Sequence, residues 1–155
     1  MKNKTLALWL TLVAGPLGLH RVYLRGKFDA IAAALAIASL IGLYGVYRAQ
    51  SLGVDDQLSW VLIPFLGFTV AGCALNAIVY GLMGTESWNV RFNPSEPVES
   101  LQGETGKMTV AGLATALFFG TTVLMASLAF SFQRYFEYQV ASAGAIEAPL
   151  KKSAD

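Results

Sequence analysis

The sequence predicts an all-α polytopic membrane protein with four transmembrane helices, arranged as a helical hairpin followed by two further spans. Two observations predict this class. Hydrophobic residues make up 55% of the 155 residues and charged residues only 14%, whereas about a quarter of the residues of a soluble domain are charged. Four long runs contain no charge at all: residues 5–20, 30–47, 57–85 and 108–133. Because a charged side chain at the bilayer centre costs roughly 2.5–3.5 kcal/mol on insertion scales, such runs are typical of membrane helices.

These runs and the polar stretches between them divide the chain into five segments. In order they are a two-helix hairpin (1–50), a third transmembrane helix (51–84), a flexible polar linker (85–106), a fourth transmembrane helix (107–138) and a disordered tail (139–155). The linker is predicted from Pro, Gly, Ser and Glu without apolar periodicity. The tail is predicted from small and polar residues at the end of the chain.

The first span is expected at about residues 5–24. Its apolar part, residues 5–19, has a helical length of about 22 Å, which is short for a hydrocarbon core of about 30 Å. The helix either runs on, with Arg21 reaching the headgroups, or is kinked or ended at Gly15-Pro16, because proline removes a backbone donor. We expect a kinked full crossing.

The second span is expected at about residues 28–47 and is rich in alanine. Small residues recur in it at every fourth position: Ala30, Ala34, Ala38 and Gly42. Small residues at this spacing allow two helix backbones to approach closely, so they predict a packing face; chance recurrence in an alanine-rich helix is the alternative. Asp29 is expected to cap the start of this helix.

The third and fourth spans contain two further candidates for helix packing. Asn76 is the one strongly polar side chain well inside a span. We expect it to face another helix and make an interhelical hydrogen bond, and a role in transport is the alternative. In the fourth span a second set of small residues recurs at every fourth position: Gly112, Ala116 and Gly120.

No catalytic, cofactor-binding or metal-binding site is expected. His20 is the sole histidine and Cys73 the sole cysteine, whereas a metal site needs several ligands at fixed spacing. No phosphate-cradling glycine loop and no G-x-S-x-G nucleophile motif occurs. The net charge of +1 gives no overall attraction for nucleic acid.

One local motif is more specific. Residues 15–26 read GPLGLHRVYLRG and follow an apolar helix. The segment resembles the two-transmembrane (TM-two) domain family, bacterial type, in which G-x-x-G-x-H-R-F-Y-L-G leads from a first helix to a second. The matching residues are Gly15, Gly18, His20, Arg21, Tyr23 and Leu24. Val22 and Arg25 depart from the pattern, as does the end of the second helix, which lacks the aromatic-then-aspartate finish.

The resemblance covers about residues 2–48, and the remainder is similar to a C-terminal two-helix extension found in some bacterial membrane proteins of this kind. It implies two helices joined by a tight turn and no established catalytic activity. The turn also has a physical interpretation of its own. Gly15 and Gly18 allow close backbone approach, His20 and Arg21 supply donors for helix-end carbonyls, and Tyr23 is suited to the membrane interface.

These observations lead to a functional expectation. We expect a non-enzymatic integral membrane protein that acts as a structural, assembly or accessory subunit of a complex in the bacterial inner membrane. A small oligomeric transporter or channel is the alternative. The expected partners are membrane lipid and either further copies of the chain or other membrane proteins, with no nucleic acid. Four spans would place both termini on one side, and six Lys and Arg against five would leave the orientation open.

Overall fold

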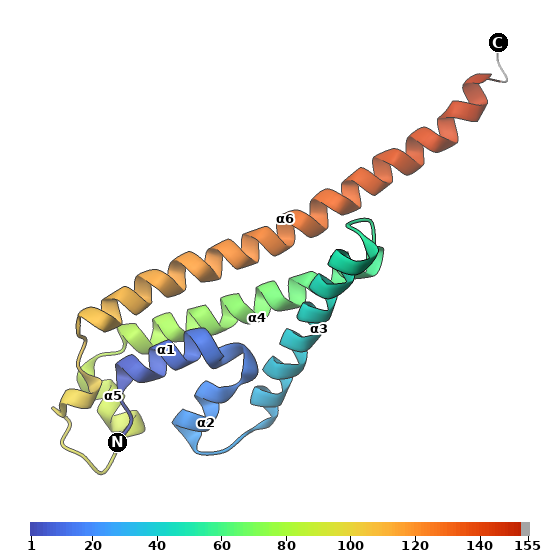
Figure 1. Ribbon diagram of the computed structural model, residues 1–155. Coiled ribbons are helices and arrows are strands. Elements are labelled where there is room, and N and C mark those ends of the chain that lie inside the picture. The colour runs from blue at the N-terminus through green and yellow to red at the C-terminus, as the bar shows by residue number, and fades with distance from the viewer. Residues whose placement is uncertain (153–155) are drawn as a thin grey trace.

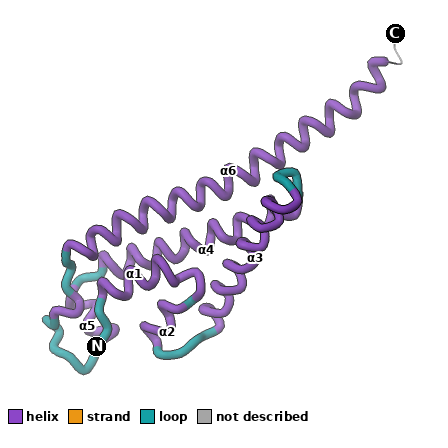
Figure 2. Tube along the Cα trace, viewed as in Figure 1, coloured by secondary structure: helices purple, strands orange, loops and turns teal. Residues whose placement is uncertain are grey.

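The computed structural model describes the backbone of residues 1–152 and the side chains of residues 1–144. The described part consists of helices and connecting loops without strands, which confirms the all-α class (Figures 1 and 2). The elements in order are α1 (Lys4–Ala14), a 3-10 turn (Gly15–Leu17), α2 (Leu19–Arg25), α3 (Ala30–Leu52), α4 (Gln57–Leu82), α5 (Thr85–Phe92), a second 3-10 turn (Leu101–Gly103) and α6 (Lys107–Lys152).

Three helices in the described part of the chain, α3, α4 and α6, are long and apolar enough to cross a membrane. In each of them less than a third of the most apolar stretch is buried inside the protein. Large side chains such as Phe68, Leu75 and Phe118 point outward instead. An outer surface of this kind is stable in lipid rather than in water, so the structure supports an integral membrane protein. The predicted count of four spans is not confirmed.

The segment expected as the first crossing, residues 5–24, folds as two short helices that double back. α1 has only 11 residues, or about 16 Å, and α2 then returns beside it (Figure 1). Hydrogen bonds join the two ends of this α1–α2 hairpin: the Asn3 backbone N–H donates to the Tyr23 hydroxyl over 2.9 Å, and the Lys2 ammonium donates to the Leu24 carbonyl. The hairpin therefore begins and ends at the same end of the bundle, which corrects the expected kinked crossing.

Side chains fix where three of the helices begin. Asn3 precedes α1 and accepts a hydrogen bond from the Leu6 backbone N–H. Asp29 precedes α3 and accepts from the Ala32 N–H, which confirms its predicted capping role. Asp56 does the same for α4 through the Ser59 N–H. Such caps satisfy backbone donors that the first turn of a helix leaves free.

α3 approaches α4 through two glycines. A Cβ atom on Gly42 would lie 2.4 Å from the Leu66 nitrogen, and one on Gly45 would lie 2.7 Å from the Leu62 Cβ. The predicted face of Ala30, Ala34, Ala38 and Gly42 is only partly the contact face, because Ala30 and Ala34 are exposed and Ala38 is half-buried. The buried residues of α3 follow a different line: Ala32, Ser39, Gly42 and Gly45.

α6 packs along α4, and the predicted small residues lie in this packed region. Gly112, Ala116 and Gly120 are all buried. A Cβ atom on Gly120 would lie 2.6 Å from the Ala74 Cβ, and one on Gly112 would lie 2.3 Å from a methyl group of Leu8 in α1. Small side chains thus let α1, α4 and α6 approach one another closely, as helices in membranes do.

The segment 85–106, expected as a flexible linker, is folded. It contains α5 and the second 3-10 turn, and both Trp88 and Asn89 are buried. The Asn89 amide donates to the carbonyls of Val98 and Ser100 over 2.9 and 2.8 Å. The polar composition was misleading because the asparagine side chains hold the loop through backbone groups, while Trp88 and Phe92 pack into an apolar cluster with Leu24.

The tail expected to be disordered, residues 139–155, is helical as far as Lys152, where α6 ends; residues 153–155 lie outside the described part. The alanine-rich composition of residues 141–148 favours this continuation. The start of the chain and the end of α6 lie at opposite ends of the molecule (Figure 1). Three crossings would agree with this arrangement, whereas four would place the two ends of the chain on the same side.

Candidate functional site

The α1–α2 hairpin turns at two glycines. Gly18 has φ +75, in the left-handed region, and a Cβ atom there would lie 2.6 Å from the Ala32 carbonyl oxygen in α3. A Cβ atom on Gly15 would lie 2.9 Å from the Cys73 Cβ in α4. The tip of the hairpin therefore packs tightly against α3 and α4, and it fits there because these positions lack side chains.

His20 lies just beyond this turn and is almost completely buried, with 1% of its surface exposed. Its Nδ1 has no hydrogen-bond partner among the described residues. The same atom lies 3.6 Å from the position that a Cβ on Gly15 would take, so the ring faces the turn and the neighbourhood of Cys73. A buried polar atom without a partner is costly, by about 1–3 kcal/mol. The expected bond from His20 to a helix-end carbonyl is not among those of the described residues.

Arg21 forms an ion pair with Asp29. Its Nε donates to Oδ1 over 2.7 Å and to Oδ2 over 3.0 Å, and its Nη2 donates to Oδ2 over 2.5 Å. Arg25 adds a longer contact of 3.1 Å. The guanidinium of Arg21 and the Ala32 N–H together hold the pKa of Asp29 far below its usual range. Asp29 therefore stays ionised, joins α2 to α3 and caps α3 at once.

The start of the chain is held by α5. The Trp88 indole N–H and the Asn93 amide both donate to the Lys2 carbonyl, over 2.9 and 3.0 Å, and the Lys2 backbone N–H donates to Asn93 Oδ1 over 2.6 Å. Together with the Tyr23 hydroxyl on Asn3, these bonds fasten the α1–α2 hairpin to the loop that follows α4. Tyr23 is thus engaged inside the protein as well as being suited to the interface.

Lys4 is fully buried at the first turn of α1. Its ammonium donates to the Met83 carbonyl over 3.0 Å and to the Thr105 hydroxyl over 2.6 Å. One side chain thereby connects the hairpin, the end of α4 and the loop before α6. A buried ammonium group needs such partners, because its charge is costly to remove from water.

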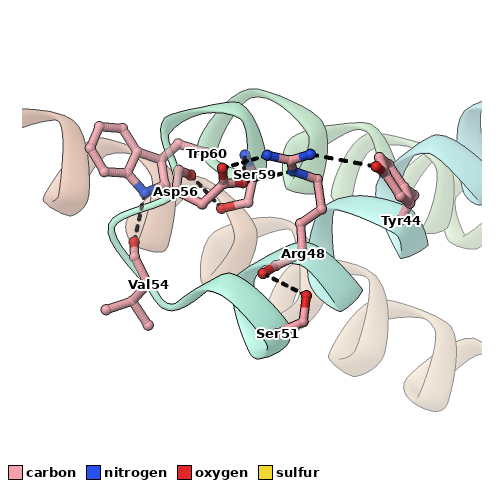
Figure 3. Close-up of polar contacts among 7 residues, drawn as sticks. All are labelled: Tyr44, Arg48, Ser51, Val54, Asp56, Ser59 and Trp60. Atoms are coloured by element: carbon pink, nitrogen blue, oxygen red, sulfur yellow. Dashed lines mark hydrogen bonds and ion pairs between the residues drawn. The ribbon is translucent and has the colours of Figure 1, made fainter.

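A second polar cluster joins α3 to α4 at the other end of the bundle (Figure 3). Arg48 donates to both oxygens of Asp56, over 2.9 and 2.7 Å. Asp56 also accepts from the Ser59 N–H over 3.0 Å. Beside this pair the Trp60 indole N–H donates to the Val54 carbonyl over 2.8 Å. The cluster therefore fixes the short turn between α3 and α4.

Asn76 differs from its predicted role. Its side chain is exposed on the outer surface of α4, and its amide donates to the Gly72 carbonyl within the same helix over 3.1 Å. The expected bond to a neighbouring helix of the chain is therefore wrong. The local bond satisfies the amide donor because the carbonyl four residues earlier is within reach.

Sequence reasoning missed several of these residues. The sequence indicated no role for Lys4, and it placed Trp88, Asn89 and Asn93 in a linker. Lys4, Trp88 and Asn93 bind groups far along the chain, as Asn93 does with Lys2, 91 residues away. Within the described residues, no group of three or more His, Cys, Asp or Glu side chains is arranged to hold a metal ion.

Comparison with protein-family models, with curated proteins and with solved structures finds no match for this chain. The packing of the α1–α2 hairpin and two polar clusters, one around Arg21 and Asp29 and one around Arg48 and Asp56, are therefore the basis for proposing a function. In both clusters charged groups connect one helix to the next.

Proposed function

We propose that the protein is a non-enzymatic integral membrane protein that acts as a structural, assembly or accessory subunit of a complex in the bacterial inner membrane. The observation that carries this proposal is the use of the charged groups between helices, of which Lys4 is buried and the two ion pairs are half-buried. Arg21 with Asp29, Arg48 with Asp56, and Lys4 each fasten one helix to another. The outward surfaces of α3, α4 and α6 remain apolar and are available to lipid or to a membrane partner.

The proposed membrane arrangement has three crossings and one re-entrant hairpin. α3, α4 and α6 cross, while the α1–α2 hairpin enters and leaves on the side of the N-terminus. The bonds from Lys2 and Asn3 to the end of α2 support this arrangement. Irregular backbone at membrane depth is tolerated where protein covers it, and the turn at Gly15 and Gly18 is covered by α3 and α4.

The hairpin changes the distribution of basic residues. With it, the N-terminal end of the molecule carries seven of the eleven Lys and Arg residues: Lys2, Lys4, Arg21, Arg25, Lys27, Arg91 and Lys107. At the opposite end, Arg48 and Arg134 lie near the ends of spanning segments, and Lys151 and Lys152 lie far along α6. Basic residues near span ends favour the cytoplasm. We therefore propose a cytoplasmic N-terminus.

Membership of the TM-two domain family remains part of the proposal. Its support is the GPLGLHRVYLRG motif of residues 15–26, together with a structural use for the motif's residues. Gly15 and Gly18 form the turn, and Arg21 fixes the start of α3 through Asp29. The family resemblance would then describe a hairpin and one crossing, rather than two crossings.

A small oligomeric transporter or channel is the second candidate. The observation in its favour is His20, a buried titratable side chain with an unpartnered Nδ1 at a break between two short helices. Broken helices that meet within the membrane form the substrate sites of many transporters.

Purification in a gentle detergent, followed by mass spectrometry, tests the two candidates. A partner protein recovered in fixed stoichiometry is the expected result, and G42V, which should separate α3 from α4, should weaken it. The matched control is G72A, since a Cβ on Gly72 meets nothing within 4 Å. Recovery of the chain alone, as an oligomer that passes ions across liposomes, would instead establish the transporter.

A further inference from the structure

A cavity of about 250 Å³ lies at the N-terminal end of the molecule, beside the Arg21–Asp29 ion pair, and shares Arg21 and Arg25 with it. It is formed where α2, the last turns of α4 and α5 meet. Its lining residues are Arg21, Leu24, Arg25, Tyr80, Arg91 and Phe92. Arg21 and Arg25 lie one turn apart on α2, whereas Arg91 belongs to α5, far along the chain, so its approach to them is a product of the fold.

The arginine side of the cavity has more positive than negative charge. Three guanidinium groups face one carboxylate, that of Asp29. Arg21 is committed to Asp29 and its side chain is only 13% exposed. Arg25 makes a single contact of 3.1 Å to Asp29 and is 54% exposed. Arg91 forms no ion pair among the side chains described, and its guanidinium lies 5.4 Å from the Phe92 ring centre. Two guanidinium groups therefore have donors left for an anion.

The opposite side of the cavity is apolar and firmly packed. Leu24 is buried, and the Tyr80 and Phe92 rings meet edge to face with centres 6.0 Å apart. Trp88 packs against both rings. The Tyr80 hydroxyl, which has no hydrogen bond to any described side chain or backbone group, adds one more donor beside the arginines. The cavity is thus basic on one side and apolar on the other.

The position of the cavity indicates the depth at which its ligand lies. Tyr80 belongs to the last turn of α4, which ends at Leu82, and α5 follows three residues later. A spanning helix leaves the hydrocarbon core near its end, in the region of the lipid headgroups. An amphiphilic cavity at this depth fits a ligand that has a charged head and an apolar tail.

We propose that this cavity binds a phosphate group, that of an anionic phospholipid in the leaflet next to the N-terminus. Arg25 and Arg91 contact the phosphate oxygens, because the planar guanidinium matches phosphate with paired hydrogen bonds. Tyr80 donates a further bond. Arg21 is a positioning residue that holds Asp29 and, through it, Arg25. Leu24 and Phe92 face the glycerol and acyl part. A soluble phosphate is the other source of the same chemistry.

The full-length chain, purified in a gentle detergent and examined by native mass spectrometry, tests the proposal. Delipidated protein is offered phosphatidylglycerol, phosphatidylethanolamine or inorganic phosphate. The variants are R91Q and R25Q, and the matched control is K107Q, which removes one exposed charge at the same end of the molecule but outside the cavity. Thermal unfolding of each variant without ligand shows whether it is folded.

We expect the wild type and K107Q to retain one phosphatidylglycerol, and R91Q and R25Q to retain it about fivefold less. Binding of inorganic phosphate with the same dependence on Arg91 and Arg25, but without lipid retention, would assign the cavity to a soluble phosphate and overturn the lipid source. Equal retention by R91Q, R25Q and K107Q would overturn the site itself. If R91Q proves unfolded, R25Q and R91K carry the same comparison, with R91K keeping the charge but losing the paired bonds.

Discussion

Arg48 and Asp56 are joined by two hydrogen bonds across the α3–α4 turn, at the same eight-residue separation as Arg21 and Asp29 across the α2–α3 turn. In each pair the aspartate also caps the helix that follows. An arginine near the end of one helix thereby fixes the first turn of the next, and the same device orients α3 at its beginning and at its end.

Loss of Asp56 should destabilise the α3–α4 turn. D56A removes the cap of α4 and leaves the Arg48 guanidinium without its carboxylate, so the midpoint of thermal unfolding in detergent should fall. D55A is the matched control, because Asp55 is the exposed neighbour and makes no ion pair among the described side chains. An equal effect of D55A and D56A would contradict a specific role for the ion pair.

Acid should weaken both pairs. The pKa values of Asp29 and Asp56 lie below their usual value of 3.8 because of the arginine partners and the backbone N–H groups they accept from. A carboxylate whose pKa is lowered by folding stabilises the protein above its unfolded pKa, and this stabilisation is lost as the pH falls toward the folded pKa. Thermal unfolding should be steady from pH 7 to about pH 5 and decline below about pH 4. The double variant D29N/D56N should show a smaller decline over the same range.

Replacement of Lys4 should separate the hairpin from α4 and α6. K4M keeps the length of the side chain but removes the donor to the Met83 carbonyl and the Thr105 hydroxyl, at an expected cost of about 1–3 kcal/mol in the free energy of unfolding. Denaturant titration in mixed micelles measures this cost. K27M, at an exposed lysine, should leave stability unchanged, and a loss there as large as in K4M would point to net charge rather than to the buried bonds.

Substitutions at Gly18 and Gly26 distinguish the stability cost of backbone strain from the cost of a steric clash. Gly18 and Gly26 have φ +75 and +72, but a Cβ on Gly18 meets α3 at 2.6 Å whereas one on Gly26 meets nothing within 4 Å. G26A should therefore cost only the strain of the left-handed conformation, about 1–2 kcal/mol. G18A should cost clearly more, because Ala32 must also move. Unfolding free energies of the two variants that agree within error would argue against the tightly packed turn.

Cysteine labelling tests the membrane arrangement. In a C73A background, K2C and K27C should both be protected from a membrane-impermeant maleimide in intact cells, while D55C and G144C should react. The reason is that the α1–α2 hairpin returns to the side of the N-terminus, whereas α3 and α6 each cross. Labelling of K2C and K27C on opposite sides would restore the four-span arrangement.

The long apolar runs predicted the helices α3, α4 and α6 because lipid excludes charge along a whole span, and this constraint is visible in sequence. The small residues around Gly112 and Gly120 indicated a packed face for a similar reason. The α1–α2 hairpin was not predictable in this way, since a run of 15 or so apolar residues fits either a crossing or a hairpin. The direction of the chain is decided at Gly18 by contact with Ala32, which only the folded structure provides.

Only some of the polar contacts could be predicted from the sequence. Asp29 was predicted as a cap from its position, because capping is a local interaction. The folding of residues 85–106 was not, because Trp88 and Asn93 bind the backbone of Lys2, 86 and 91 residues away. Asn76 was misassigned because a nearby carbonyl of its own helix satisfies its amide as well as a neighbouring helix would.

The length of α6 has a practical consequence for the end of the molecule opposite the N-terminus, if the proposed membrane arrangement holds. The ring of Tyr138 still packs on Trp60 beside the α3–α4 turn, with ring centres 5.9 Å apart, and the helix then continues to Lys152. This part of the helix is about 20 Å long, which exceeds the thickness of one headgroup layer. A reporter or affinity domain joined to the end of the chain would stand clear of the lipid surface, where it is open to reagents, antibodies or a docking protein.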